Sequence, residues 1–105
     1  IDRVQFLDLC RVSFEEGTRR LAAARVAMAA GDTARAIIDA HTLKGTAATL
    51  GAYSCRERAR ALEKALRAGD AEAAGRAHAA LEDLWRELGP VFAAWIAGQG
   101  GGGDA

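Results

Sequence analysis

The sequence has a single proline, few aromatic residues and no excess of charge of either sign. Its 14 basic and 14 acidic side chains balance over 105 residues. A balanced chain offers no electrostatic footprint for nucleic acid or an anionic membrane, so we expect neither as a partner. No apolar run approaches the roughly 18 residues of a membrane helix, and no signal peptide is apparent. These absences predict a cytoplasmic protein, or the cytoplasmic part of a larger sensor kinase.

Cysteine is also scarce. Cys10 and Cys55 are far apart and form no CxxC pattern. Each occupies an apolar position of a predicted helix, where a free thiol behaves as a small hydrophobic side chain. We therefore predict two buried thiols, without a disulfide or a metal role.

Alanine, leucine, arginine and glutamate, which are strong helix formers, dominate what is present. Gly31-Asp32 and Gly69-Asp70 each place a glycine that ends one helix before an aspartate that caps the next. Gly51 marks a third break, followed by a candidate capping box of Ser54 and Glu57. The fold class is therefore all-α, with helices at about 2–30, 33–50, 55–68 and 71–97.

Each predicted helix carries an apolar or small residue at alternating spacings of three and four, which is typical of an antiparallel up-and-down four-helix bundle. We include Met28 and Trp95 in the core. The four predicted seams are Leu7, Cys10, Phe14, Gly17, Leu21, Ala24 and Met28; Ala36, Ala40, Leu43, Ala47 and Leu50; Cys55, Ala59, Leu62 and Leu66; and Ala77, Leu81, Leu84, Leu88, Val91 and Trp95.

Two positions should disturb the regular pattern. Gly17 is predicted to be a kink or a point of close approach in the first helix. Pro90 lacks a backbone donor, so it should kink or break the last helix. The glycine-rich stretch 98–105 has little to bury, which predicts one domain over 1–97 and a disordered tail.

The second predicted helix contains a histidine that does not belong to the core. At about 100° per residue, His41 points away from the seam and faces solvent. Lys44 and Gly45 lie on the same side. A solvated face is normally charged, so a small and apolar patch here indicates docking. The predicted docking residues are Ala34, Ile37, Ile38 and Ala48.

These residues would suit a phosphorylated imidazole. A neutral His41 is a nucleophile, and Lys44 can screen the charge of a phosphoryl group. Gly45 costs about 1 kcal/mol relative to alanine inside a helix, so it indicates a need for space. An ordinary surface histidine beside a helix glycine is the alternative that these three residues leave open.

The stretch AHTLKGTAATLGAYSCRERARALE, residues 40–63, resembles the histidine-containing phosphotransfer (HPt) domains of bacterial phosphorelays. The family pattern is H-x-x-K-G with small residues after it, an L-G pair, and an L-E pair near the end of the next helix. Cys55 departs from it, since leucine is more frequent there. The matching positions are His41, Lys44, Gly45, Ala47, Leu50, Gly51, Leu62 and Glu63.

The resemblance implies that His41 exchanges a phosphoryl group with an aspartate of a response-regulator receiver domain, with a histidine kinase as a further partner. Lys44 would assist the phosphate and Gly45 would accommodate it. The chain has no clustered acidic triad and no glycine-rich nucleotide loop, so we expect neither an ATP site nor a metal or cofactor of its own. Mg²⁺ is expected on the receiver. We expect a monomeric phosphocarrier, not an enzyme, alone or within a hybrid kinase.

Three alternatives stay open. The chain could be the phosphoacceptor domain of a chemotaxis-type histidine kinase, which shares the H-x-x-K-G core, or a docking module without a phosphate. It could also be a metal- or haem-binding bundle using His41 and His78, although no short ligand spacing joins them. His78 lies one position past the seam residue Ala77, which predicts a boundary or surface histidine.

Overall fold

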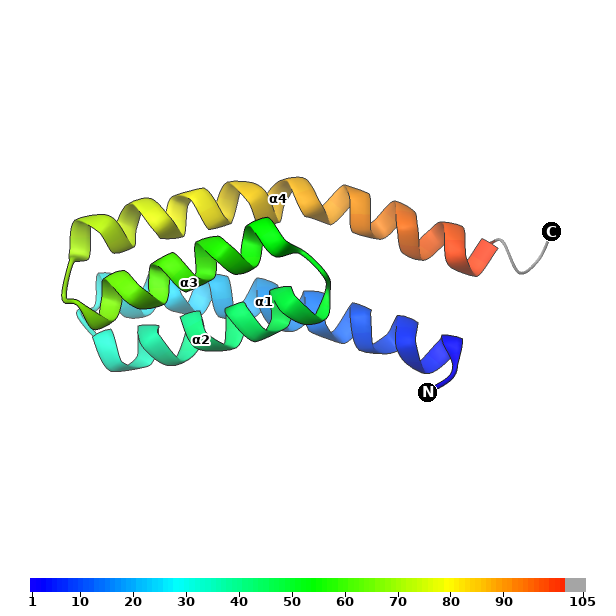
Figure 1. Cartoon of the computed structure of the whole chain (residues 1–105), viewed down its shortest axis with the longest axis horizontal. Coiled ribbons are helices and arrows are strands. Elements are labelled where there is room, and N and C mark those ends of the chain that lie inside the picture. Colours follow the sequence, from blue (N-terminus) through cyan, green and yellow to red (C-terminus); the bar gives the residue numbers. More distant parts are fainter. Residues whose placement is uncertain (102–105) are drawn as a thin grey trace.

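Four antiparallel helices form an up-and-down bundle in the computed structural model, which describes residues 1–101 (Figure 1). The helices are α1 (Arg3–Ala29), α2 (Thr33–Thr49), α3 (Tyr53–Arg67) and α4 (Ala71–Gly101). Each helix packs on the next, and α4 returns to α1. The predicted all-α four-helix fold is confirmed. No helix within the described residues is long and apolar enough to cross a membrane.

The turns follow the glycine signals in the sequence. Gly31, Gly51 and Gly69 have φ angles of 74°, 69° and 71°, in the left-handed region that glycine adopts without steric cost. Asp32 and Asp70 then accept hydrogen bonds from backbone N–H groups in the first turns of α2 and α4. Both predicted glycine–aspartate reversals are confirmed.

The start of α3 differs from the prediction. The helix begins at Tyr53, and its N-cap, Ala52, makes no capping hydrogen bond through its side chain. Gly51 reverses the chain so close to the helix that Ser54 already lies in the first turn. The predicted capping box of Ser54 and Glu57 is therefore wrong.

The core consists largely of the predicted seams. Leu43, Leu62 and Leu81 are almost fully buried, and small residues such as Ala36 and Ala40 allow α2 to approach its neighbours closely. Met28 packs against this core while remaining partly exposed. The structure thus confirms the inner stripes of α2 and α3, which fix the outward faces of those two helices.

The predicted burial of the two cysteines is confirmed. Cys10 and Cys55 are both buried and free. Burial disfavours the thiolate and raises the pKa of both thiols. They act as small core side chains.

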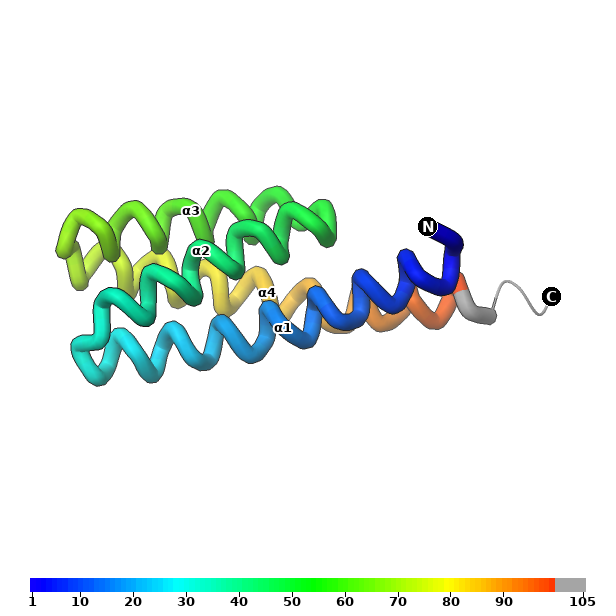
Figure 2. Tube along the Cα trace, turned by 90° about the horizontal axis from the view of Figure 1, so that it is seen from below, coloured from blue at the N-terminus to red at the C-terminus, as the bar shows by residue number. Residues whose placement is uncertain are grey.

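α1 and α4 are much longer than the helices that cover them. They contain 27 and 31 residues, whereas α2 and α3 contain 17 and 15. Consequently the beginning of α1 and the end of α4 extend past the bundle (Figure 2). Val91 and Trp95 fall in this extension and are 66% and 40% exposed, so their predicted burial in the core is wrong. Trp95 packs against Phe6 instead, with ring centroids 6.3 Å apart.

The predicted irregular positions have different outcomes. Gly17 is a point of close approach, because a Cβ atom there would collide with the ring of Trp85. Pro90 lies inside α4 without breaking it, and the preceding Gly89 relieves the steric restriction that proline places on its neighbour. α4 continues through Gly101, so the predicted helix end at 97 is wrong. Residues 102–105 of the predicted tail lie outside the described residues.

A buried ion pair fastens α1 to α2. The carboxylate of Asp39 is fully buried and accepts a hydrogen bond from Arg20 at 2.9 Å. Arg20 also binds Glu16 on its own helix at 2.7 Å. Because a buried carboxylate is costly without a cation, this pairing favours one arrangement of α1 against α2.

Candidate functional site

His41 lies in the middle of α2, on the side turned away from the core. Its side chain is 65% exposed, whereas the adjacent Ala40 is fully buried. Ala34, Ile38 and Ala48 are exposed on the same side, as predicted. The exception among the predicted docking residues is Ile37, which is half-buried because it packs against the core.

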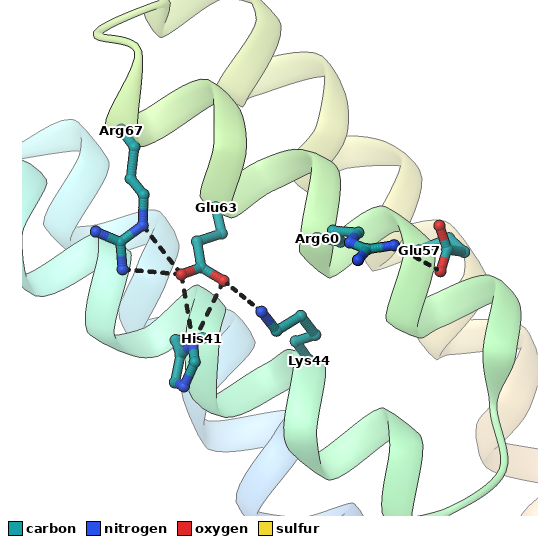
Figure 3. Close-up of polar contacts among 6 residues, drawn as sticks. All are labelled: His41, Lys44, Glu57, Arg60, Glu63 and Arg67. Atoms are coloured by element: carbon teal, nitrogen blue, oxygen red, sulfur yellow. Dashed lines mark hydrogen bonds and ion pairs between the residues drawn. The ribbon is translucent and has the colours of Figure 1, made fainter.

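A carboxylate from α3 lies beside the imidazole (Figure 3). The two oxygens of Glu63 are 3.3 and 3.4 Å from Nδ1 of His41. The Glu63 side chain is only 10% exposed, so it is held between α2 and α3. Because an ionised carboxylate can only accept, this contact favours the tautomer with its proton on Nδ1. The lone pair is then on Nε2, which Figure 3 shows on the side of the ring away from Glu63.

Two cations hold the same carboxylate. Lys44 places Nζ 3.0 Å from Oε1 of Glu63, and Arg67 donates two hydrogen bonds to Oε2 at 2.9 and 3.1 Å. Burial by itself would raise the pKa of Glu63, but the hydrogen bonds from Lys44, Arg67 and His41 outweigh it and lower the pKa to about 2. Glu63 is therefore an anion at neutral pH.

His41 and Lys44 both contact Glu63, and Glu63 also binds Arg67. The sequence identified Glu63 only as part of the family pattern. The role of Arg67 was not predicted. Glu63 follows directly on the core residue Leu62, and an acidic residue at the margin of a buried stripe requires partners. That position and the spacing of four between Glu63 and Arg67 were the available signals.

Gly17 and Gly45 both lie inside helices, but the packing around them differs. A larger side chain would collide with a neighbouring residue at Gly17 and not at Gly45. At Gly17 the ring of Trp85 occupies the space of a side chain. At Gly45 a Cβ atom would have no neighbour within 4 Å. Since glycine destabilises a helix by about 1 kcal/mol relative to alanine, the packing of residues 1–101 does not explain Gly45. Gly45 leaves open space on this part of α2.

The second histidine is part of the core. His78 is 5% exposed, and its Nε2 is 2.9 Å from the carbonyl oxygen of Leu21, to which it donates. The prediction of a boundary or surface position is wrong because the buried face of α4 also includes Trp85 and is broader than the seam. His41 is on the surface of α2 and His78 is buried against α1, an arrangement that does not fit a shared metal or haem. Residues 1–101 contain no cluster of three or more candidate metal ligands.

Comparison with known proteins identifies one family. The model of the Hpt domain family matches residues 8–89, which is most of the chain and includes all of α2 and α3. Comparisons with curated proteins and with solved structures find no match. The matched region contains the whole site of His41, Lys44, Gly45 and Glu63, together with the four-helix core. The chain therefore belongs to the Hpt domain family.

Proposed function

We propose that this protein is a phosphorelay intermediate in which Nε2 of His41 exchanges a phosphoryl group with the aspartate of a response-regulator receiver domain. The observation that carries the proposal is the contact between Nδ1 of His41 and the buried, ionised Glu63. It leaves the nucleophilic nitrogen directed outward from a rigid helix. Membership of the Hpt family supports phosphotransfer as the general chemistry.

The proposed reaction needs no base. The lone pair of Nε2 attacks the phosphorus of the aspartyl phosphate in line with the bond to the aspartate oxygen. The N–P bond forms as that P–O bond breaks, and the aspartate leaves as a carboxylate with the electron pair. The ring of His41 then has a proton on Nδ1 and a phosphoryl group on Nε2, so it is positively charged. The adjacent anion of Glu63 stabilises this charge, and reverse transfer restores the neutral ring.

Lys44 is proposed to stabilise the phosphoryl group. Its ammonium lies one helical turn from His41 and binds the same carboxylate. When a phosphoryl group is present, Lys44 can turn towards its oxygens while Arg67 keeps Glu63 paired through two hydrogen bonds. Without Arg67, the departure of Lys44 would leave the charge of a nearly buried carboxylate to be balanced by the ring of His41 alone.

The exposed side of α2 is proposed to receive the receiver domain. Ala34, Ile38 and Ala48 present small or apolar groups around His41, and Ile37 lies at the half-buried margin of this row. Such a patch is favourable on a surface that is covered by a partner. We propose that the receiver supplies Mg²⁺ and the acceptor aspartate, that a histidine kinase supplies the phosphate, and that the exchange takes place in the cytoplasm.

The experiment is a comparison of phosphorylation in the wild type and His41→Gln. Incubation with a phosphorylated receiver domain, or with a histidine kinase and ATP, should label the wild type with an acid-labile, base-stable phosphate. His41→Gln should fold normally and acquire none. Equal labelling of the two proteins would overturn the proposal. A wild type that takes no phosphate from any receiver, kinase or phosphoramidate would be a docking module.

A further inference from the structure

A strip of positive charge lies beside His41 on α3. We define the α3 strip as Arg60, Lys64 and Arg67, which follow one another along the side of the helix that faces α2. Together with Lys44 and Glu63 they line an open hollow between the two helices. Figure 3 shows three of the four cations of this region, with Arg67 and Lys44 on either side of the carboxylate that contacts His41.

The cations that line the hollow outnumber the carboxylates that contact them. Glu63 is shared by Lys44 and Arg67, so one carboxylate serves two cations. Glu57 is 3.9 Å from Arg60, and both side chains are mostly exposed, which makes that ion pair weak in water. The region therefore contains four cations and two carboxylates that pair with them, Glu63 and Glu57. The chain as a whole has no net charge, so this excess is local.

The surface around His41 consequently has two chemically different flanks. At about 100° per residue, Ile38 lies about 60° to one side of His41 on α2 and Lys44 about 60° to the other. Lys44 binds Glu63 and so marks the side that faces α3. The flank with Ile38 is apolar, whereas the flank towards α3 is basic. A partner that covers His41 has to meet both.

Covering the basic flank requires negative charge from the partner. Cations that lose water without gaining an anion destabilise a complex, whereas a carboxylate placed beside them forms charge-assisted hydrogen bonds. Charges at the rim of an interface act mainly on the association rate and on the orientation of the partner. A receiver surface with acidic side chains on one side of its aspartate fits this arrangement.

We infer that the α3 strip recognises acidic side chains of the receiver domain and thereby sets the rate and orientation of docking over His41. This inference rests on the proposed function. In this arrangement the exposed residues Ala34, Ile38 and Ala48 of α2 contact the receiver close to the phosphate. The α3 strip selects the partner by its charge. Receivers with acidic residues at the edge that meets α3 should be preferred to receivers with neutral or basic residues there.

Two charge reversals on the same helix form a matched test. Arg60→Glu changes the strip, while Arg58→Glu makes the same substitution about 200° away around α3. Arg58 lies towards α4, in a different hollow with Ala61 and Leu84. Both arginines are exposed, so neither substitution opens the core. Arg60→Glu combined with Lys64→Glu increases the change within the strip.

The measurement is the second-order rate constant for transfer from phosphorylated receiver domains of the same genome, at about 50 mM and about 1 M NaCl. For the receiver that transfers fastest, Arg60→Glu should reduce the constant about 10-fold and the double variant about 100-fold at low salt, and Arg58→Glu less than twofold. The loss should shrink to a few-fold at high salt, where the Debye length is about 3 Å.

Phosphoramidate separates this inference from the proposed function. It needs no docking surface, so at high salt it should label His41 equally in the wild type and in all three variants. If it labels His41 and the strip variants receive phosphate from the receiver as fast as Arg58→Glu does, the inference is wrong while the proposed function stands. If neither phosphoramidate nor any receiver labels His41, both are overturned.

Discussion

The two histidines of the described residues lie in opposite environments. His41 is on the surface of α2, and His78 is in the interior between α1 and α4. His41 is mostly exposed and its Nδ1 faces an anion, whereas His78 is buried and its Nε2 faces a backbone carbonyl. In both places a hydrogen bond determines which nitrogen holds the proton. The side chain of His41 is 65% exposed, whereas His78 is 5% exposed. Under the proposed function, this difference in access separates the reactive histidine from the structural one.

The largest expected effect is on the free energy of unfolding, which should depend much more on His78 than on His41. His78→Ala removes a buried ring and leaves the Leu21 carbonyl without its donor, so it should lower the free energy of unfolding by about 2–4 kcal/mol. His41→Ala removes an exposed ring and should change it by less than about 0.5 kcal/mol. Urea denaturation gives both values. Equal losses would mean that the two environments do not differ as described.

The second effect concerns access to His41. Gly45→Glu should slow transfer from a receiver about 30-fold, because its side chain would occupy the approach to Nε2. This fold-change corresponds to a loss of about 2 kcal/mol in transition-state stabilisation. Gly75→Glu is the matched control, since it is also an exposed helical glycine with nothing within 4 Å.

Both glycine variants should remain helical by circular dichroism, and phosphoramidate should label both. If Gly45→Glu transferred as fast as Gly75→Glu, the steric explanation of Gly45 would be incorrect.

A smaller effect is expected at Lys44. Lys44→Met removes the cation proposed to stabilise the phosphoryl group and should slow transfer about 10-fold, the range of one charge-assisted hydrogen bond. Lys44→Arg keeps the charge and should retain most of the rate. The half-life of phosphorylated His41 should also shorten in Lys44→Met. An unchanged rate and half-life in that variant would exclude Lys44 from the chemistry.

The smallest effect is a dependence of stability on pH through Glu63. Its pKa is lowered from 4.5 to about 2, so the paired carboxylate stabilises the fold above pH 4.5, and this contribution is lost as the pH falls through about 2. Glu63→Gln lacks the titrating group. The difference in unfolding free energy between wild type and Glu63→Gln should be nearly constant from pH 7 to 5 and narrow by about 0.8 kcal/mol at pH 4. A difference that stays constant to pH 3 would contradict the lowered pKa.

The sequence was sufficient to predict the bundle because its signals are local. Glycine followed by aspartate marks two turns, and the seams of α2 and α3 follow from the helical period. The outward position of His41 follows from the same period. Local signals continue along α4 past the ends of α2 and α3 and do not show whether a neighbouring helix covers them, which is why Val91 and Trp95 were placed in the core. They also do not give the width of a buried face, which is why His78 was placed at the surface.

The network around Glu63 depends on the packing of two helices. Lys44 and Glu63 are 19 positions apart, and only the docking of α2 on α3 brings their charges to 3.0 Å. Helical spacing could have paired Glu63 with Arg67, but it could not have shown that the pair lies against Nδ1 of His41. The residue types at the site were therefore predictable from the sequence, whereas the reason that Nε2 is the free nitrogen was not.

The central claim is tested most directly by locating the phosphate on the phosphorylated protein. After labelling by a receiver domain, NMR of ¹⁵N-labelled histidine rings identifies both the residue and the nitrogen that has formed the N–P bond. The geometry predicts phosphate on Nε2 of His41, with Nδ1 still protonated beside Glu63 and the signals of His78 unchanged. Phosphate on Nδ1 of His41, or on any other residue, would contradict the account.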